Sequence, residues 1–92
     1  MKTDARFIEL CQALSVKSRV EILELLKAQS LCVNALTCRL GITQSAVSQH
    51  LRILKSAGLV KADKRGYWMH YSINLPTLKK YKEFLDSWAI IT

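Results

Sequence analysis

Apolar residues recur at three- and four-residue steps along the first part of the chain, which is the spacing of amphipathic helices. The pattern predicts one helix over 7–14 and a second over 16–26, with Ser15 as the N-cap of the second. A third, short helix is expected to begin at a Ser30 cap and to end at Gly41 in a left-handed conformation. The first 41 residues are therefore expected to be mostly helical.

The next predicted helix is divided into an apolar side and a polar side. Thr43 offers its N-cap and Gly58 closes it. Val47, Leu51 and Leu54 form the inward stripe. The opposite side carries small or hydrogen-bonding side chains, which are Gln44, Ser45, Ser48, Gln49 and Arg52. A short helix, a turn containing glycine and a second helix together make the outline of a helix-turn-helix.

After this helix the pattern changes to that of strands. Residues 59–64 and 67–73 are short and rich in β-branched or aromatic residues, and Arg65 and Gly66 separate them. They predict a two-stranded hairpin. The chain is thus expected to be a single domain over 1–92, mainly α with a β-hairpin wing, containing about five helices and two strands.

A last helix is expected to open at Asn74 and Pro76. Its stripe of Tyr81, Leu85 and Trp88, continued by Ile90 and Ile91, is more apolar surface than the terminal helix of a very small monomer needs. Such a stripe usually marks an interface, so we expect a homodimer that uses these residues. Core packing within one chain is the alternative.

Composition favours a polyanionic partner. Fourteen Lys and Arg oppose seven Asp and Glu, for a net charge of +7, although charge alone does not separate nucleic acid from an anionic membrane. The longest uncharged apolar run is too short for a membrane span, and the N-terminus lacks the apolar stretch of a signal peptide. We therefore expect a cytoplasmic protein without membrane contact. Three cysteines in no paired spacing are expected to be reduced thiols.

The polar side of the second helix in the helix-turn-helix outline fits DNA recognition. Gln pairs well with adenine in the major groove and Ser can serve either partner, whereas a Lys-rich face would read mainly phosphate. Thr43, at the helix start, belongs with this group. Lys61, Lys64 and Arg65 near the hairpin tip could contact the DNA backbone or the minor groove. A solvated polar face and solvated surface charges are the alternatives.

The segment LCVNALTCRLGITQSAVSQHLRILKSAGLVKADKRGYWMHYSI, with ALSVKSRVEILELL upstream, resembles the ArsR/SmtB family of winged-helix repressors. The resemblance covers nearly the whole chain. It implies a homodimer whose first and last helices form the interface and whose two recognition helices enter successive major grooves of a near-palindromic double-stranded DNA operator. The base-reading positions that it implies are Gln44, Ser45, Ser48 and Gln49. The wing contacts that it implies are Lys64 and Arg65.

The residues depart from the metal-sensing members of that family. Where the arsenic-sensing branch places three cysteines, in the segment equivalent to residues 31–37, this chain has Cys32, Asn34 and Thr37. The site that other members build on the last helix is also missing, because Leu75 stands where its acidic ligand would begin. We expect no intact metal site and no cofactor. On an ideal helix Cys38 would be turned about 120° from Cys32, away from its face.

Three interpretations of the cysteines stay open. Cys11 and Cys38 occupy apolar stretches, which favours packing. Cys32 lies near a predicted helix N-terminus, where the dipole favours the thiolate, and is the candidate thiol sensor. Metalloid binding that recruits Cys11 or a second subunit is the third interpretation. His50 and His70 are expected to be structural or phosphate-contacting groups.

A sequence-specific dimeric transcriptional repressor is the function that these features favour. The alternatives are an architectural or non-specific winged-helix DNA-binding protein, a thiol- or redox-responsive repressor, and a winged helix that binds protein. No enzyme is expected, because the sequence has no evident nucleophile–base pair, paired carboxylates, phosphate-cradling Gly loop or metal cluster.

Overall fold

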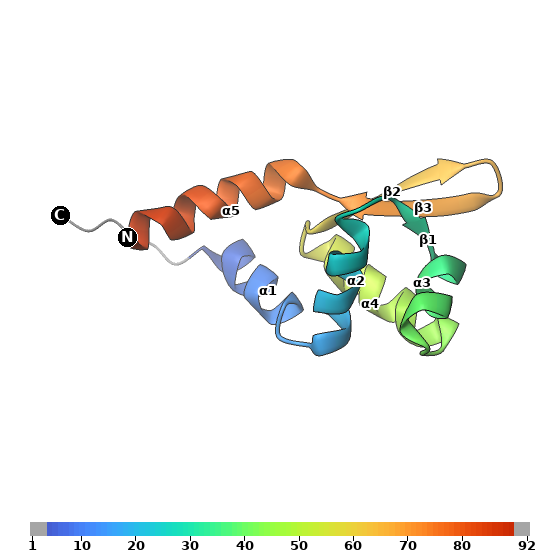
Figure 1. Cartoon of the computed structure of the whole chain (residues 1–92). Helices are drawn as coiled ribbons and strands as arrows, with labels where there is room; N and C mark the ends of the chain where they lie inside the picture. The colour runs from blue at the N-terminus through green and yellow to red at the C-terminus, as the bar shows by residue number, and fades with distance from the viewer. Residues whose placement is uncertain (1–3, 90–92) are drawn as a thin grey trace.

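The computed structural model describes residues 4–89 of the chain. Its elements follow in the order α1 (Ala5–Ala13), α2 (Lys17–Leu26), β1 (Leu31–Cys32), α3 (Val33–Leu40), α4 (Gln44–Ser56), β2 (Val60–Arg65), β3 (Trp68–Ile73) and α5 (Leu75–Trp88). The molecule is elongated, with extents of 49 × 23 × 21 Å. Helices α1 and α5 lie at one end, and the β2–β3 hairpin projects from the other (Figure 1). Among the described residues no helix is long and apolar enough to cross a membrane.

The connection between α1 and α2 differs from the predicted one. The N-cap of α2 is Val16, which makes no side-chain capping bond, so the expected Ser15 cap is wrong. The Ser15 hydroxyl instead donates to the carbonyl of Gln12, at 2.6 Å. The serine side chain is therefore used to satisfy a carbonyl at the end of α1, where backbone acceptors lack helical partners.

Arg19 completes this connection. Its Nε donates to the carbonyl oxygen of Ala13 at 2.7 Å, and Nη2 lies 3.4 Å from the carbonyl oxygen of Gln12. A cation at a helix C-terminus both satisfies free carbonyls and complements the helix dipole. Arg19 therefore fastens the end of α1 to the first turn of α2, which explains the arginine in the segment ALSVKSRVEILELL.

The sheet contains one strand more than the sequence predicted. Leu31 and Cys32 form β1, which pairs antiparallel with β3, so the sheet has three strands in the order β1-β3-β2. The expected Ser30 cap of the third helix is also wrong, because the N-cap of α3 is Cys32, without a side-chain capping bond. The two residues are extended because their ladder partners in β3 hold them so. Those partners lie about 40 residues further along the chain, so the sequence around Leu31 and Cys32 does not itself predict a strand.

The β2–β3 hairpin is in register from Val60 opposite Ile73 to Arg65 opposite Trp68. Arg65 thus belongs to the strand, and the turn is formed by Gly66 and Tyr67, one position later than predicted. Gly66 has φ of 65°, a left-handed conformation that glycine adopts without steric cost.

The core lies between the helices and the inner face of the sheet. The apolar stripe of α4 is buried as predicted, since Val47, Leu51 and Leu54 are 0–1% exposed. The remaining buried side chains come from every other helix, from the first and second strands and from the bend before β2: Phe7, Leu10, Ala13, Ile22, Leu26, Leu31, Leu36, Leu59, Val60 and Tyr81. Because one side of α4 is fixed in this core, its polar side must face outward.

Helix α5 begins after Asn74, with Pro76 in its first turn, as predicted. Tyr81 is its one buried residue. Its aromatic side chains surround Phe7 of α1, with ring centroids 5.5 Å away for Tyr81, 4.8 Å for Phe84 and 5.7 Å for Trp88. This aromatic cluster joins the two terminal helices and leaves the rest of α5 exposed or half-buried.

Candidate nucleic-acid interface

The turn between α3 and α4 is built as the sequence predicted. Gly41 ends α3 with φ of 67°, and its N–H donates to the carbonyl of Thr37 at 2.9 Å. The Thr43 side chain caps α4 by accepting a hydrogen bond from the N–H of Ala46 at 3.1 Å. These local bonds, together with the buried stripe of α4, fix the angle between the two helices of the motif.

The polar side of α4 forms a continuous exposed surface, which we call the recognition face. Its members, all exposed, are Thr43, Gln44, Ser45, Ser48, Gln49 and Arg52. Ser45, Ser48, Gln49 and Arg52 line one open hollow on the surface. The structure therefore brings together the side chains that were predicted on this helix, with their donors and acceptors directed away from the core.

The hairpin presents cations and aromatic rings at its tip. Lys64 and Arg65 are exposed, as expected for wing residues. The Nε of Arg65 lies 3.5 Å from the Asp63 carboxylate, in an ion pair whose side chains are 58% and 66% exposed, so solvent screens the pair strongly. Sequence reasoning missed Tyr67, which is 96% exposed, and Trp68, which is 55% exposed. The sequence pattern places both in the second predicted strand, over 67–73. The signal that could have found Tyr67 is its position directly after Gly66, in the turn; Trp68 follows as the first residue of β3.

His50 is the one half-buried polar side chain in the middle of α4. Burial lowers the pKa of His50 below its usual 6.5, and the nearby Arg19 guanidinium acts in the same direction. Its Nδ1 is buried and has no hydrogen-bond partner within residues 4–89. The imidazole is therefore neutral near pH 7 and does not add to the positive charge of the surface.

An apolar groove runs between α1 and α5 at the other end of the molecule. It is lined by Leu10, Leu14, Leu75, Leu78, Tyr81 and Leu85, with Lys79, Lys82 and Asp86 also contributing. Lys82 and Asp86 form an ion pair of 2.8 Å on its edge. Of the residues expected at a dimer interface, Leu85 is 46% and Trp88 59% exposed, whereas Tyr81 is 6% exposed and belongs to the core of its own chain. Ile90 and Ile91 lie outside the described residues.

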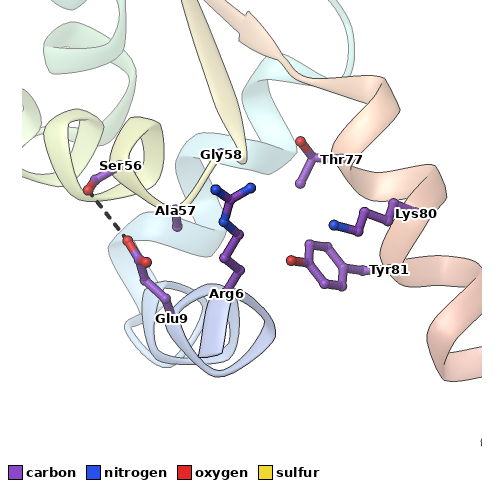
Figure 2. Close-up of a pocket in the computed structure, with 8 residues that line it drawn as sticks. All are labelled: Arg6, Glu9, Ser56, Ala57, Gly58, Thr77, Lys80 and Tyr81. Carbon is purple, nitrogen blue, oxygen red and sulfur yellow. Dashed lines mark hydrogen bonds between the residues drawn. The ribbon is translucent and has the colours of Figure 1, made fainter. Parts of the chain in front are cut away.

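A pocket lies where the end of α4 meets α1 and α5. Figure 2 shows Arg6 rising from α1 in its centre, with Lys80 and Tyr81 directed toward it from α5. The Ser56 hydroxyl donates to the Glu9 carboxylate at 3.4 Å and connects α4 with α1. Burial raises the pKa of Tyr81 above its usual value, and the Asp4 carboxylate acts in the same direction. The pocket is thus a polar junction between the recognition helix and the two terminal helices.

The cysteines are not arranged as the sequence suggested. Cys11 and Cys38 are exposed, so the packing interpretation does not hold for them within the chain. Cys32 is half-buried and belongs to β1. The angle expected between Cys32 and Cys38 on one ideal helix therefore does not apply.

Over residues 4–89, no three His, Cys, Asp or Glu side chains gather closely enough to hold a metal ion. At the third position of the arsenic site stands Thr37, whose buried Oγ1 is a hard, neutral donor in place of a thiolate.

Comparison with known proteins gives consistent results. The sequence profile of the family described as "Bacterial regulatory protein, arsR family" matches residues 17–62. The transcriptional activator HlyU of Vibrio cholerae is 34% identical over 91% of this chain and 78% of its own length. A transcriptional repressor SmtB homologue of Synechocystis is 37% identical over 85% of this chain and 60% of its own length.

Solved structures resemble the fold at similar identity. The structure of Vibrio cholerae HlyU superposes with a TM-score of 0.75 and 34% identity, covering 88% of each chain. The homodimeric winged helix-turn-helix DNA-binding domain of Mb0332 from Mycobacterium bovis, a possible ArsR-family regulator, has a TM-score of 0.77 and 27% identity, covering 91% of this chain and 78% of its own. The helix-turn-helix, its exposed recognition face, the hairpin wing and these similarities together show that the chain belongs to the arsR family of winged helix-turn-helix, DNA-binding transcriptional regulators.

Proposed function

We propose that the chain is a homodimeric repressor that reads a near-palindromic operator by direct contact between the recognition face and base edges. The observation that supports this most is the composition of the exposed face of α4, which offers amide and hydroxyl groups where non-specific binding would need only cations. The buried stripe on the opposite side of α4 gives the face a fixed orientation.

Base reading is assigned to the side chains on the first two turns of α4. The amides of Gln44 and Gln49 each carry a donor and an acceptor, the combination that pairs with adenine N6 and N7 in the major groove. Ser45 and Ser48 are short enough to let the helix approach the base edges closely. Arg52, one turn further on, is suited to a guanine or to a phosphate.

The wing adds affinity without reading sequence. Lys64 is exposed, and no ion pair occupies its ammonium group among the described residues, so it is available to a phosphate. Arg65 is held near Asp63 by a weak, exposed pair that a DNA phosphate can replace. Both cations are the last two residues of β2, next to the turn of the hairpin. The hairpin projects away from α1 and α5 (Figure 1).

Dimerisation would place two recognition faces and two wings, one of each from each subunit, in a symmetric arrangement. The apolar groove and the exposed Leu85 and Trp88 form one surface on the terminal helices, at the opposite end of the molecule from the wing. A second copy related by a two-fold axis would cover this surface. Such a dimer presents two recognition helices with the same symmetry, and the matching DNA is a palindrome with half-sites about one helical turn apart.

The direction of regulation is proposed as repression, in which the bound dimer blocks a promoter. The named relatives include an activator and a repressor, so the family alone does not fix the direction. Repression needs only tight occupancy of DNA, which this single small domain can supply without a cofactor or a catalytic group. The protein would act wherever the DNA is, which in a bacterium is the cytoplasm.

Binding to the promoter upstream of the protein's own gene tests this function. Titration should give a complex that survives an excess of unrelated DNA, because direct base contacts usually favour the specific site by about 10³-fold or more. If unrelated DNA instead removes the complex in proportion to the length of competitor added, the protein is an architectural or non-specific DNA-binding protein. Transcription from that promoter should fall when the purified protein is added.

A further inference from the structure

We propose that the pocket between α1, the end of α4 and α5 binds a small dianionic oxyanion, and that this ligand weakens DNA binding. We call it the junction pocket; its polar lining comes from Arg6, Glu9, Ser56, Thr77, Lys80 and Tyr81. The ligand class comprises phosphate and its small monoesters and short dicarboxylates, which share two negative charges carried on oxygen atoms. The site stands on the geometry of the pocket alone. The effect on DNA binding rests on the proposed function and specifies how it would be regulated.

Two cations from different helices converge on the junction pocket. Arg6 comes from α1 and Lys80 from α5, and Figure 2 shows the guanidinium and ammonium groups directed into the same space. The Nζ of Lys80 lies 5.3 Å from the ring centroid of Tyr81, whose hydroxyl is directed toward Arg6. Like charges repel each other, so two cations that face one cavity are stabilised when an anion lies between them.

The two carboxylates near the pocket are engaged by other donors. Oδ1 of Asp4 accepts a hydrogen bond from the main-chain N–H of Arg6 at 2.9 Å, as the N-cap of α1. The Glu9 carboxylate accepts one from the Ser56 hydroxyl at 3.4 Å. Within residues 4–89, neither Arg6 nor Lys80 takes part in an ion pair. Both cations are therefore available to an anion from solution, which can form charge-assisted hydrogen bonds with them.

The size and the hydroxyl groups of the junction pocket suit a small oxyanion. Its volume is about 250 Å³, below the roughly 300–1,000 Å³ of sites for drug-sized ligands. Thr77 Oγ1 lies 3.6 Å from the point where a Cβ atom of residue 58 would stand, so Gly58 leaves this hydroxyl accessible. Burial and the Asp4 carboxylate raise the pKa of Tyr81 above its usual value, so the phenol keeps its proton. Both hydroxyls can therefore donate hydrogen bonds to an anion beside the cations.

The junction pocket is separate from the surfaces assigned to DNA and to assembly. Ser56 is the last residue of α4, whereas Gln44 is the first, about 18 Å away at 1.5 Å per residue. The pocket and the apolar groove share one lining residue, Tyr81. A small anion in the pocket therefore does not compete for the side chains of the recognition face or for most of those in the groove.

A bound dianion opposes DNA binding through its charge. It lowers the formal net charge of each chain by two, from +7 to +5. Because DNA is a polyanion, its affinity for the protein should fall, most strongly at low salt, where screening is weakest. The ligand also connects α1 and α5 with the end of α4, so it favours the arrangement of these helices in which both cations reach it.

Calorimetric titration of the folded full-length protein with two dianions tests the site. Inorganic phosphate at mildly alkaline pH, where it is mainly dianionic, and malonate are titrated separately, with sodium chloride at equal ionic strength as the reference. At least one dianion should bind one site per chain with a dissociation constant of about 1 mM or tighter. Binding of phosphate alone would assign the site to phosphate compounds, and binding of malonate alone to dicarboxylates. If neither dianion binds more tightly than chloride, the proposal is wrong.

Variants of the two cations locate the bound anion. Arg6→Gln and Lys80→Gln should each fold, because both side chains are exposed, and should each weaken dianion binding by at least about tenfold through loss of a charge-assisted hydrogen bond. Lys55→Gln is the matched control, since Lys55 is an exposed cation beside Ser56 that does not line the pocket. It should bind the dianion as the wild type does. An equal loss in all three variants, or no loss in the two pocket variants, would show that the anion does not occupy this pocket.

Operator binding tests the regulatory half. At low salt, the dianion that binds should weaken operator binding by the wild type at least about fivefold relative to chloride at equal ionic strength, the lower end of typical coupling between sites. Arg6→Gln and Lys80→Gln should bind the operator and lose this response. Dianion binding that leaves operator affinity unchanged would overturn the regulatory half.

Two further outcomes separate the anion site from the proposed function. If a dianion binds in the junction pocket of a protein that binds no operator at all, the proposed function fails while the anion site stands. If neither dianion binds, and Arg6→Gln and Lys80→Gln each make the salt dependence of operator binding shallower, the two cations contact DNA phosphate and the small-anion site is wrong.

Discussion

At the scale of single residues, polar side chains with definite partners fix the geometry around the recognition helix. Thr43 caps α4, Gly41 ends α3, and Arg19 binds the carbonyls at the end of α1. The Thr43 cap and the Gly41 stop could be predicted because they depend on neighbouring residues. The role of Arg19 could not, since it requires knowing how α1 and α2 meet. Ser15 was misassigned for the same reason, because two helix ends compete for one hydroxyl.

His50 gives the residue-scale prediction. Burial, aided by Arg19, lowers its pKa in the folded state, so the unfolded chain binds the proton first as the pH falls. Its contribution to stability is therefore fully present above about pH 6.5 and is lost as the pH falls through the lowered folded-state value. The wild type should lose stability between pH 7.5 and pH 5 relative to His50→Gln. Urea unfolding at both pH values measures this, and parallel losses in the two proteins would contradict it.

At the scale of elements, the sheet and the last helix show where local patterns stop being informative. The buried stripe of α4 has a strong helical period and was predicted residue by residue. Strand β1 is two residues long and exists because it pairs with β3, so no periodicity in the sequence predicts it. Helix α5 was predicted with its correct start, yet only packing against Phe7 decides that Tyr81 faces inward while Leu85 stays exposed.

The wing gives the element-scale prediction. Lys64→Ala should weaken binding to every DNA sequence by a similar factor, because the ammonium group contacts phosphate and not bases. The slope of log affinity against log salt should become shallower by about two, which is one lost phosphate contact from each subunit. Titrations at several salt concentrations, on operator and on unrelated DNA, measure both effects. If the ratio of affinity for the operator to affinity for unrelated DNA differs between the variant and the wild type, Lys64 reads sequence.

At the scale of the whole molecule, the wing and the terminal helices occupy opposite ends of an elongated domain. The wing projects from one end, and the terminal helices with their apolar groove form the other (Figure 1). The junction pocket, where Ser56 bonds to Glu9, links the end of the recognition helix to these helices (Figure 2). This contact connects α4 directly with α1, one of the two terminal helices that line the groove.

Leu85 gives the prediction for assembly. Leu85→Glu places a charge in the apolar groove, where burial against a second subunit would be costly, so the protein should sediment as a folded monomer. Leu75→Glu, at a groove residue that is 59% exposed, should act in the same way. Val20→Glu is the matched control, because Val20 is 39% exposed on α2 and lies outside the groove. Dimers that persist in both groove variants would place the interface elsewhere.

The most direct measurement of base reading by the recognition face compares Gln49→Ala with the wild type on operators changed one base pair at a time. Loss of a bidentate amide contact should remove about 1–3 kcal/mol of discrimination at one position of each half-site. Discrimination at the other positions and affinity for unrelated DNA should stay nearly the same. An equal loss of affinity on every operator variant would contradict base reading and leave the recognition face as a solvated surface.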